Sequence, residues 1–480
     1  MNLRRIFSDA LVSSSRILAA LLRAIVVIPI FTNVLGADGY GIWAALMVTI
    51  ELFASTGGLH LHGALIRFAP DNGLSETFSD ILSLGTIAAI GSGSLFWMIA
   101  MALPLSNLLG GEVQSANIAA VGGLLIATRI LSDIVINYPR ADNQVKLYEL
   151  LYISRTTIEI AAIVIAVLVT PTVLAAAIAL ASVWFASLLL IPVFGRHAVT
   201  RPSVARFGEY LRYGVPMAPS EISGTLLTHA DKYIILWMLS PAATGIYTVA
   251  YNIVRFFPQV GGVFNSTLYP NISAAWENDK VNAIQDFYSI FFRGYAILMI
   301  PAAVGISLLA EPALQFLSTP EIAAKGKDLI PILVVGLLIQ GVEYPVSYIF
   351  TSAKRTEVIA KLTFLSVLVN LILNILLIPS IGLKGAATAT LTAQVIKTAL
   401  LIYYSRRFVP LSLPIHDIGR ATFSTAIMAA VLSLVPTTGL SSLTHLIVHA
   451  GLGASVYLVI LTIIGGIRHR DIESIRHLIQ

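Results

Sequence analysis

Charged residues are scarce in this chain of 480 residues: they make up 11% of the sequence, whereas 57% is hydrophobic. A typical soluble domain carries about 25% charged residues. Lipid can replace water around a chain with so few charges, so the composition indicates a membrane protein. Mostly apolar runs such as Ile17 to Leu35 and Ile160 to Val169 support this interpretation, because a helix that crosses a bilayer needs about 20 such residues.

Cysteine is absent altogether. This excludes disulfides, iron–sulfur clusters and cysteine-ligated zinc. The chain also lacks a G-x-x-x-x-G-K-[ST] phosphate loop, which argues against ATP hydrolysis by that route. Its apolar segments are joined by short loops that leave no room for a soluble catalytic domain. We therefore expect a protein that is not an enzyme.

The apolar periodicity predicts an all-α polytopic membrane protein with about 14 transmembrane helices. The first six predicted spans are 8–35, 40–66, 78–103, 113–138, 146–170 and 172–194. The other eight are 216–239, 241–270, 282–310, 328–351, 355–378, 382–405, 416–436 and 441–467.

Lysine and arginine define the expected orientation, because cytoplasmic loops carry an excess of both. With the N-terminus inside, 19 of the 30 fall in inner segments and three, Lys325, Lys327 and Lys384, in outer loops. We expect both termini in the cytoplasm and a multi-pass protein of the inner or plasma membrane. The basic residues are spread over short loops rather than gathered on one face, which argues against a nucleic-acid partner.

An internal repeat predicts two lobes. The outer turn Leu35 to Trp43 matches Leu239 to Tyr247 at an offset of 204 residues, and a weaker match pairs 140–144 with 352–356. Six spans separate the matched elements, so the lobes should be related by a pseudo-two-fold axis along the membrane normal. We expect an N-terminal lobe over 1–194, a basic cytoplasmic linker over 195–215, a C-terminal lobe over 216–405, and two extra helices with a tail over 406–480.

Charges at membrane depth are costly, about 3 kcal/mol or more each, and usually face a bundle interior or a wet cavity. Arginine binds phosphate well, because its planar fork reaches two oxygens at once. The candidate substrate-binding cations are Arg16, Arg23, Arg255, Arg293 and Lys397. Arg16 and Arg23 share one helix face with no acid near them in sequence.

Acids at the same depth suggest other roles. Arg129 with Asp133 and Arg155 with Glu159 have the i,i+4 spacing of helix ion pairs. The candidates for ion coupling or cavity pairing are Glu51, Asp231, Lys232 and Glu343. We expect no metal site, because His60 and His62 would project to different faces of one helix and His229 stands apart. No resident cofactor is expected; a sodium ion or a proton is the coupling ion that Asp231 could serve.

Several motifs resemble the polysaccharide transport branch of the multidrug/oligosaccharidyl-lipid/polysaccharide exporter superfamily. They occur in order along nearly the whole chain: Leu35-Gly36, Tyr40-Gly41-Ile42-Trp43, Ala64 to Pro70, Asp231, Gly245 to Tyr251, Tyr269 to Ser273, Asn370, Asn374, Pro379, Gly382 and Gly385-Ala386-Ala387. The resemblance implies two lobes that rock between inward- and outward-open states around a cationic cavity.

The resemblance also implies a function: flipping a polyprenyl-(pyro)phosphate-linked oligosaccharide across the membrane for surface polysaccharide, lipopolysaccharide or glycan assembly. The expected partners are this lipid-linked glycan, membrane lipids and polysaccharide assembly enzymes, and we expect a monomer. The alternative is a cation-coupled drug antiporter of the same superfamily, for which acidic cavities would be typical. A membrane-embedded glycosyltransferase is disfavoured by the short loops.

Overall fold

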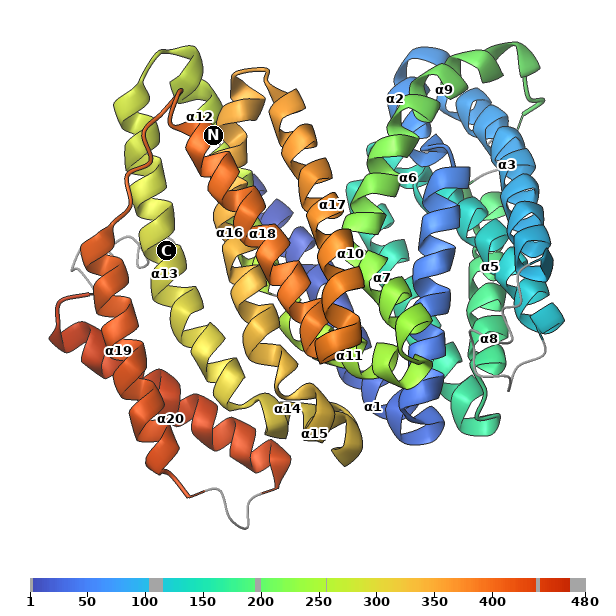
Figure 1. Ribbon diagram of the computed structural model, residues 1–480. Coiled ribbons are helices and arrows are strands. Elements are labelled where there is room, and N and C mark those ends of the chain that lie inside the picture. Colours follow the sequence, from blue (N-terminus) through green and yellow to red (C-terminus); the bar gives the residue numbers. More distant parts are fainter. Residues whose placement is uncertain (1–2, 103–114, 195–199, 256, 437–440, 467–480) are drawn as a thin grey trace. The chain divides into compact units, whose positions relative to one another are not determined.

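The computed structural model describes residues 3–102, 115–194, 200–255, 257–436 and 441–466. Side chains are described from Leu22 on, apart from 115–116, 220, 223, 227–228 and 258–267 within those ranges. All regular secondary structure in these residues is helical, which confirms the all-α class (Figure 1). By its internal contacts the chain forms two compact units, Met1–Thr248 and Val249–Gln480. The predicted linker at 195–215 falls within the first unit, and the predicted lobe boundaries stay a prediction.

The first unit contains the long helix α1, Leu3–Gly57, in which Gly36 leaves the helical region with φ 71° and ψ −175°. A positive φ of this kind suits glycine, which has no Cβ. The kink at Gly36 stands where the sequence predicts the outer turn. The chain continues through α2 (Leu61–Asn72), α3 (Leu74–Ala102), α5 (Ser115–Ile136), α6 (Tyr138–Ala141), α7 (Val145–Val169), α8 (Val173–Ala186) and the 3₁₀ helix η1 (Ser187–Phe194).

Within the first unit, the described part of the basic linker packs against α2 and α3. It contains η2 (Val204–Arg206), α9 (Phe207–Gly214) and η3 (Val215–Met217). The buried Asp80 of α3 accepts hydrogen bonds from the backbone N–H of Ser203 at 2.5 Å and from the Tyr210 hydroxyl at 3.2 Å, and pairs with Arg206 Nε at 2.9 Å. Burial and the charge of Asp80 raise the pKa of Tyr210, so its hydroxyl stays protonated and can donate. No sequence pattern predicts this role of Asp80.

After the linker come α10 (Ala218–Met238) and α11 (Pro241–Val254), and α11 crosses the division between the units. The second unit continues with α12 (Phe257–Glu277), α13 (Val281–Leu308), α14 (Ala310–Leu317), α15 (Pro320–Gly326), α16 (Leu329–Ser352), α17 (Thr356–Ile381), α18 (Leu383–Ser405), α19 (Ile415–Leu434) and α20 (Ser442–Ile463). Helix α16 packs against α12, α13 and α18, and α17 packs against α18 (Figure 1). An aromatic core of Tyr288, Phe291, Phe292, Tyr295 and Phe350 holds α13 to α16.

Ten segments of the described chain are long and apolar enough to cross a membrane. The first of these, Leu22–Asn72, covers two predicted spans that meet at the Gly36 kink. The predicted spans at 216–239, 241–270 and 416–436 correspond to α10, α11 with α12, and α19, which are not among the ten. Three charged residues, Glu221, Asp231 and Lys232, lower the apolarity of α10, and α11 has only 14 residues. The number of fourteen spans stays a prediction.

Candidate transport site

An ionic network joins α5, α7 and α8 in the first unit; its Arg155 and Glu159 are buried, whereas Arg129 and Asp133 are half-buried. Asp133 pairs with Arg129 Nε at 2.7 Å on its own helix and with Arg155 Nη1 at 3.0 Å from α7. Arg155 Nε also lies 3.2 Å from Glu159, whose carboxylate accepts a hydrogen bond from the indole of Trp184 at 2.6 Å. The four charges of the two i,i+4 pairs therefore form one network. The contacts of Asp133 with Arg155 and of Glu159 with Trp184 join different helices. They depend on helix packing and could not be predicted from the spacing of these residues in the sequence.

A pocket of about 190 Å³ lies beside this network. The ionisable residues of its lining are three acids, two histidines and one arginine, which come from α1, the turn after it, α2, α5 and α10: Glu51, His60, His62, Arg129, Asp133 and Glu221. The sequence predicts Glu51, Arg129 and Asp133 at membrane depth, but no sequence pattern brings them together with the histidines or Glu221.

A chain of polar contacts runs along α10 from this pocket. Glu51 Oε2 lies 3.8 Å from His229 Nε2, and the Lys232 ammonium lies 3.1 Å from His229 Nδ1. The buried Asp231 takes a different set of partners: it accepts hydrogen bonds from the Tyr247 hydroxyl at 2.6 Å and from the backbone N–H of Lys232 at 2.8 Å. The side chains of Asp231 and Lys232 thus contact different partners, as expected for consecutive residues on one helix.

Two of the predicted substrate-binding cations are paired within the second unit. Lys397 of α18 lies 2.6 Å from Glu343 of α16, with both side chains almost fully buried. Arg293 of α13 lies 3.4 Å from Asp417 of α19 and donates to the backbone carbonyl of Gly466 at 3.0 Å. Asp417 was not among the predicted site residues, because it sits at the edge of a predicted span. These cations anchor helices to one another in the structure described.

The three remaining predicted substrate-binding cations, Arg16, Arg23 and Arg255, have no ion pair of this kind among the described side chains. Arg23 is half-buried on α1 and makes no hydrogen bond or ion pair within the part of the chain that the structure describes. Arg255 is exposed at the end of α11 and donates to the Asn252 amide oxygen at 3.2 Å, with no carboxylate partner among the described residues. Arg16 lies on α1, but its side chain is outside the described residues. Arg23 and Arg255 therefore keep guanidinium groups that no described acid neutralises.

Residues 30–321 match the family described as polysaccharide biosynthesis protein. The chain belongs to this family. Among relatives, the probable low-salt glycan biosynthesis flippase Agl15 of Haloferax volcanii is 27% identical over 283 residues, covering 59% of this chain and 60% of that protein. The probable flippase AglR of the same organism is 25% identical over 417 residues, covering 83% of each. The family match confirms the resemblance to the polysaccharide transport branch.

Two solved transporter structures resemble this chain in fold. The lipid II flippase MurJ in an inward closed conformation aligns with a TM-score of 0.76 at 17% identity, over 97% of this chain and 99% of that one. An inward-facing multidrug resistance transporter of the MATE family, in the MOP superfamily, aligns with a TM-score of 0.65 at 15% identity, over 81% and 93%. This chain thus shares its helical fold with these two transporters.

Proposed function

We propose that this protein flips a polyprenyl-(pyro)phosphate-linked oligosaccharide across the cell membrane by alternating access, making and breaking no covalent bond. The observation that carries the proposal is that each unit has one predicted substrate-binding arginine, Arg23 or Arg255, that no described acid neutralises. A guanidinium can bind two phosphate oxygens at once and does not lose its charge at physiological pH. Such groups suit the phosphate of a lipid carrier.

The family and its named relatives support the substrate class. The matched family is one of polysaccharide biosynthesis, and the two relatives from Haloferax volcanii are named as flippases, one of them in glycan biosynthesis. A drug antiporter would need to attract cations, whereas Arg23 and Arg255 would repel them.

The proposal includes a location. The excess of Lys and Arg in the predicted inner segments supports an orientation with both termini in the cytoplasm. The protein would work as a monomer in the cell membrane, surrounded by lipid and supplied by polysaccharide assembly enzymes that build the glycan on the inner face.

Net transport against a concentration gradient needs an energy source, for which we propose a sodium ion or a proton acting at Asp231. Intramembrane carboxylates commonly serve as coupling sites, and Asp231 is buried with Tyr247 as its hydrogen-bond donor. In vesicles that contain the protein, a sodium or proton gradient should accelerate transport by the unsubstituted protein and leave Asp231→Asn unaffected. Equal acceleration in both would remove Asp231 from this role.

The experiment that tests the function uses vesicles containing the full chain and a polyprenyl-diphosphate-linked oligosaccharide, with access of the glycan to an external lectin as the readout. Arg23→Ala or Arg255→Ala should lower the transport rate by roughly ten- to a hundredfold, because a hydrogen bond to a charged group contributes about 1.5–3 kcal/mol. Arg23→Lys should recover part of the rate, since it keeps the charge but loses the fork.

Arg67→Ala is the matched control, because Arg67 forms an exposed pair with Asp71 at 2.7 Å, and such pairs contribute little. Wild-type rates in both Arg23→Ala and Arg255→Ala would remove the phosphate-binding role. Efflux of cationic drugs without any glycan transport would favour the antiporter.

A further inference from the structure

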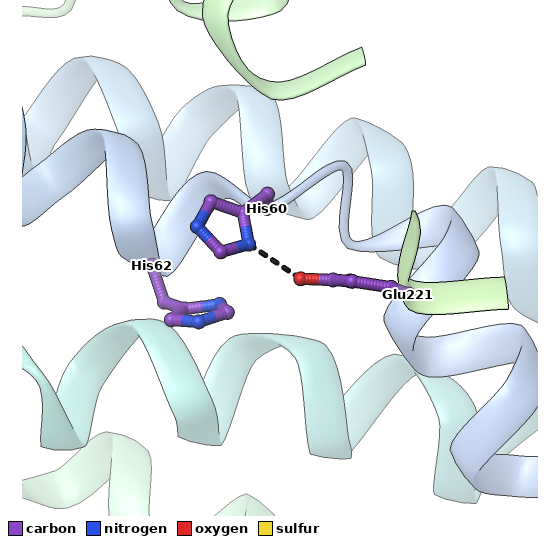
Figure 2. A group of neighbouring side chains, drawn as sticks. All are labelled: His60, His62 and Glu221. Atoms are coloured by element: carbon purple, nitrogen blue, oxygen red, sulfur yellow. Dashed lines mark hydrogen bonds and ion pairs between the residues drawn. The ribbon is translucent and has the colours of Figure 1, made fainter. Parts of the chain in front are cut away.

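Two histidines and a glutamate converge in the first unit, outside the residues to which transport is assigned above. Figure 2 shows His60, His62 and Glu221, whose ligand atoms all lie within 4.8 Å of one another. His60 lies in the turn between α1 and α2, His62 in the first turn of α2, and Glu221 in the first turn of α10. Among the described residues this is the one group of three such ligands.

The backbone at the turn explains why the two histidines meet. Leu59 and His60 both have positive φ, and His60 lies in the left-handed region at φ 53° and ψ 27°. Residues i and i+2 of an uninterrupted helix face different ways, but the left-handed turn brings the two rings to 4.7 Å between centroids. Gly63 accommodates the His60 ring, because a Cβ at this position would collide with His60 Nε2. The expectation that His60 and His62 project to different faces of one helix is therefore wrong.

Hydrogen bonding leaves part of the cluster available. His60 Nδ1 contacts Glu221 Oε1, whereas His62 makes no hydrogen bond in the part of the chain that the structure describes. The other acids of the pocket are engaged: Asp133 by Arg129 and Arg155, and Glu51 by His229. All three cluster residues are half-buried and line the pocket of about 190 Å³, so water can reach a fourth position.

We propose that His60, His62 and Glu221 bind one divalent transition-metal ion of the zinc class. Imidazole nitrogen with one carboxylate oxygen suits zinc, whereas magnesium and calcium prefer oxygen ligands. Ligand atoms about 2.0–2.1 Å from a tetrahedral zinc ion lie roughly 3.3 Å apart, so side-chain rotations suffice to close the site. The ion takes the place of the contact between His60 and Glu221 and recruits His62.

Such an ion would tie the turn between α1 and α2 to the start of α10. It would add a link to the packing of α10 against α1, and unit 1 should become more resistant to unfolding when the ion is bound, since a ligand that binds only the folded state stabilises it. The proposal does not depend on the transported substrate.

The test measures zinc binding by calorimetry on the metal-stripped full chain in detergent, carrying a purification tag without histidine. The unsubstituted protein should bind one Zn²⁺ ion per chain, and the ion should raise its melting temperature. His62→Gln and Glu221→Gln should each weaken binding at least tenfold. His445→Gln is the matched control, because the rings of His445 and His449 meet edge-to-face in α20 without a third described ligand. The zinc affinity of this variant should equal that of the unsubstituted protein.

His62→Gln leaves the contact between His60 and Glu221 in place, so its melting temperature without zinc should match that of the unsubstituted protein. X-ray absorption at the zinc edge of the unsubstituted protein gives an answer that needs no variant: two imidazole ligands are expected, and sulfur from cysteine is impossible in this chain. Absence of stoichiometric binding, equal affinity in all variants, or a zinc shell without imidazole would overturn the proposal.

Discussion

Lys397 carries a charge that the surrounding helices almost completely enclose. Its ammonium lies 2.6 Å from Glu343, which also accepts a hydrogen bond from Gln394 at 2.8 Å. Removing one partner of a buried pair typically costs about 3–5 kcal/mol, because the other charge stays behind without compensation. Lys397→Met and Glu343→Met should therefore each sharply lower the temperature at which the purified protein loses its monodisperse state on heating.

The double variant Lys397→Met/Glu343→Met separates a structural pair from a transport site. With both charges removed, much of the lost stability should return, since replacing a buried pair by apolar groups is often close to neutral. If Lys397 binds substrate, the double variant will be stable but unable to transport. Single variants as stable as the unsubstituted protein would contradict the pairing itself.

At the same scale, Arg155 shows what the sequence could and could not predict of the site. Its partner Glu159 follows from the i,i+4 spacing, but its contact with Asp133 comes from the packing of α7 on α5. His60 and His62 were separated in the prediction because it assumed an uninterrupted helix. Gly57-Gly58 indicates a break at this place, but it does not predict that Leu59 and His60 adopt positive φ. The apolar pattern of the sequence thus predicted which charged residues lie at membrane depth, whereas their partners depend on tertiary structure.

At the scale of elements, two segments make a reciprocal backbone contact: residues 37–41, just after the Gly36 kink of α1, and residues 241–245, at the start of α11. A Cβ added at Gly41 would collide with the carbonyl oxygen of Pro241, and one added at Gly245 would collide with that of Ala37. The repeat offset of 204 residues exchanges Ala37 with Pro241 and Gly41 with Gly245. The segment 37–41 thus contacts its own repeat partner, 241–245, as a local two-fold relation requires.

Gly41→Ala and Gly245→Ala should therefore cause defects of similar size. Each forces two backbones apart, and overpacking of this kind typically costs about 1–3 kcal/mol. The measurement is the yield of monodisperse protein after heating, with transport as a second readout. Gly91→Ala on α3 is the control, since a Cβ there meets nothing within 4 Å. Unequal defects, or none, would argue that the contact does not reflect the repeat.

The helices themselves were largely predictable from hydropathy, and their interruptions were less so. The outer turn expected after residue 35 is present as the Gly36 kink within α1. The single span expected over 241–270 is instead two helices, α11 ending at Val254 and α12 beginning at Phe257. Apolar runs fix where a helix can lie in a membrane, whereas breaks depend on backbone conformations that the neighbouring helices stabilise.

For the whole molecule, the absence of cysteine becomes an experimental advantage. Every introduced cysteine is the only thiol in the chain, so its reaction with a membrane-impermeant maleimide reports on one position alone. Asp142 and Arg355 are exposed at predicted inner turns, and Thr170 and Lys325 are exposed at predicted outer turns. Each side of the membrane is thus represented once in each unit.

Intact cells should label Thr170→Cys and Lys325→Cys, while Asp142→Cys and Arg355→Cys should react only after the membrane is permeabilised. The physical reason is the bias of Lys and Arg toward the cytoplasmic side, which these four positions test in both units. Labelling of all four in the opposite sense would reverse the orientation of the whole chain. A reversal restricted to Lys325 and Arg355 would instead mean that an odd number of spans separates Thr170 from Lys325, which would contradict two parallel six-helix lobes.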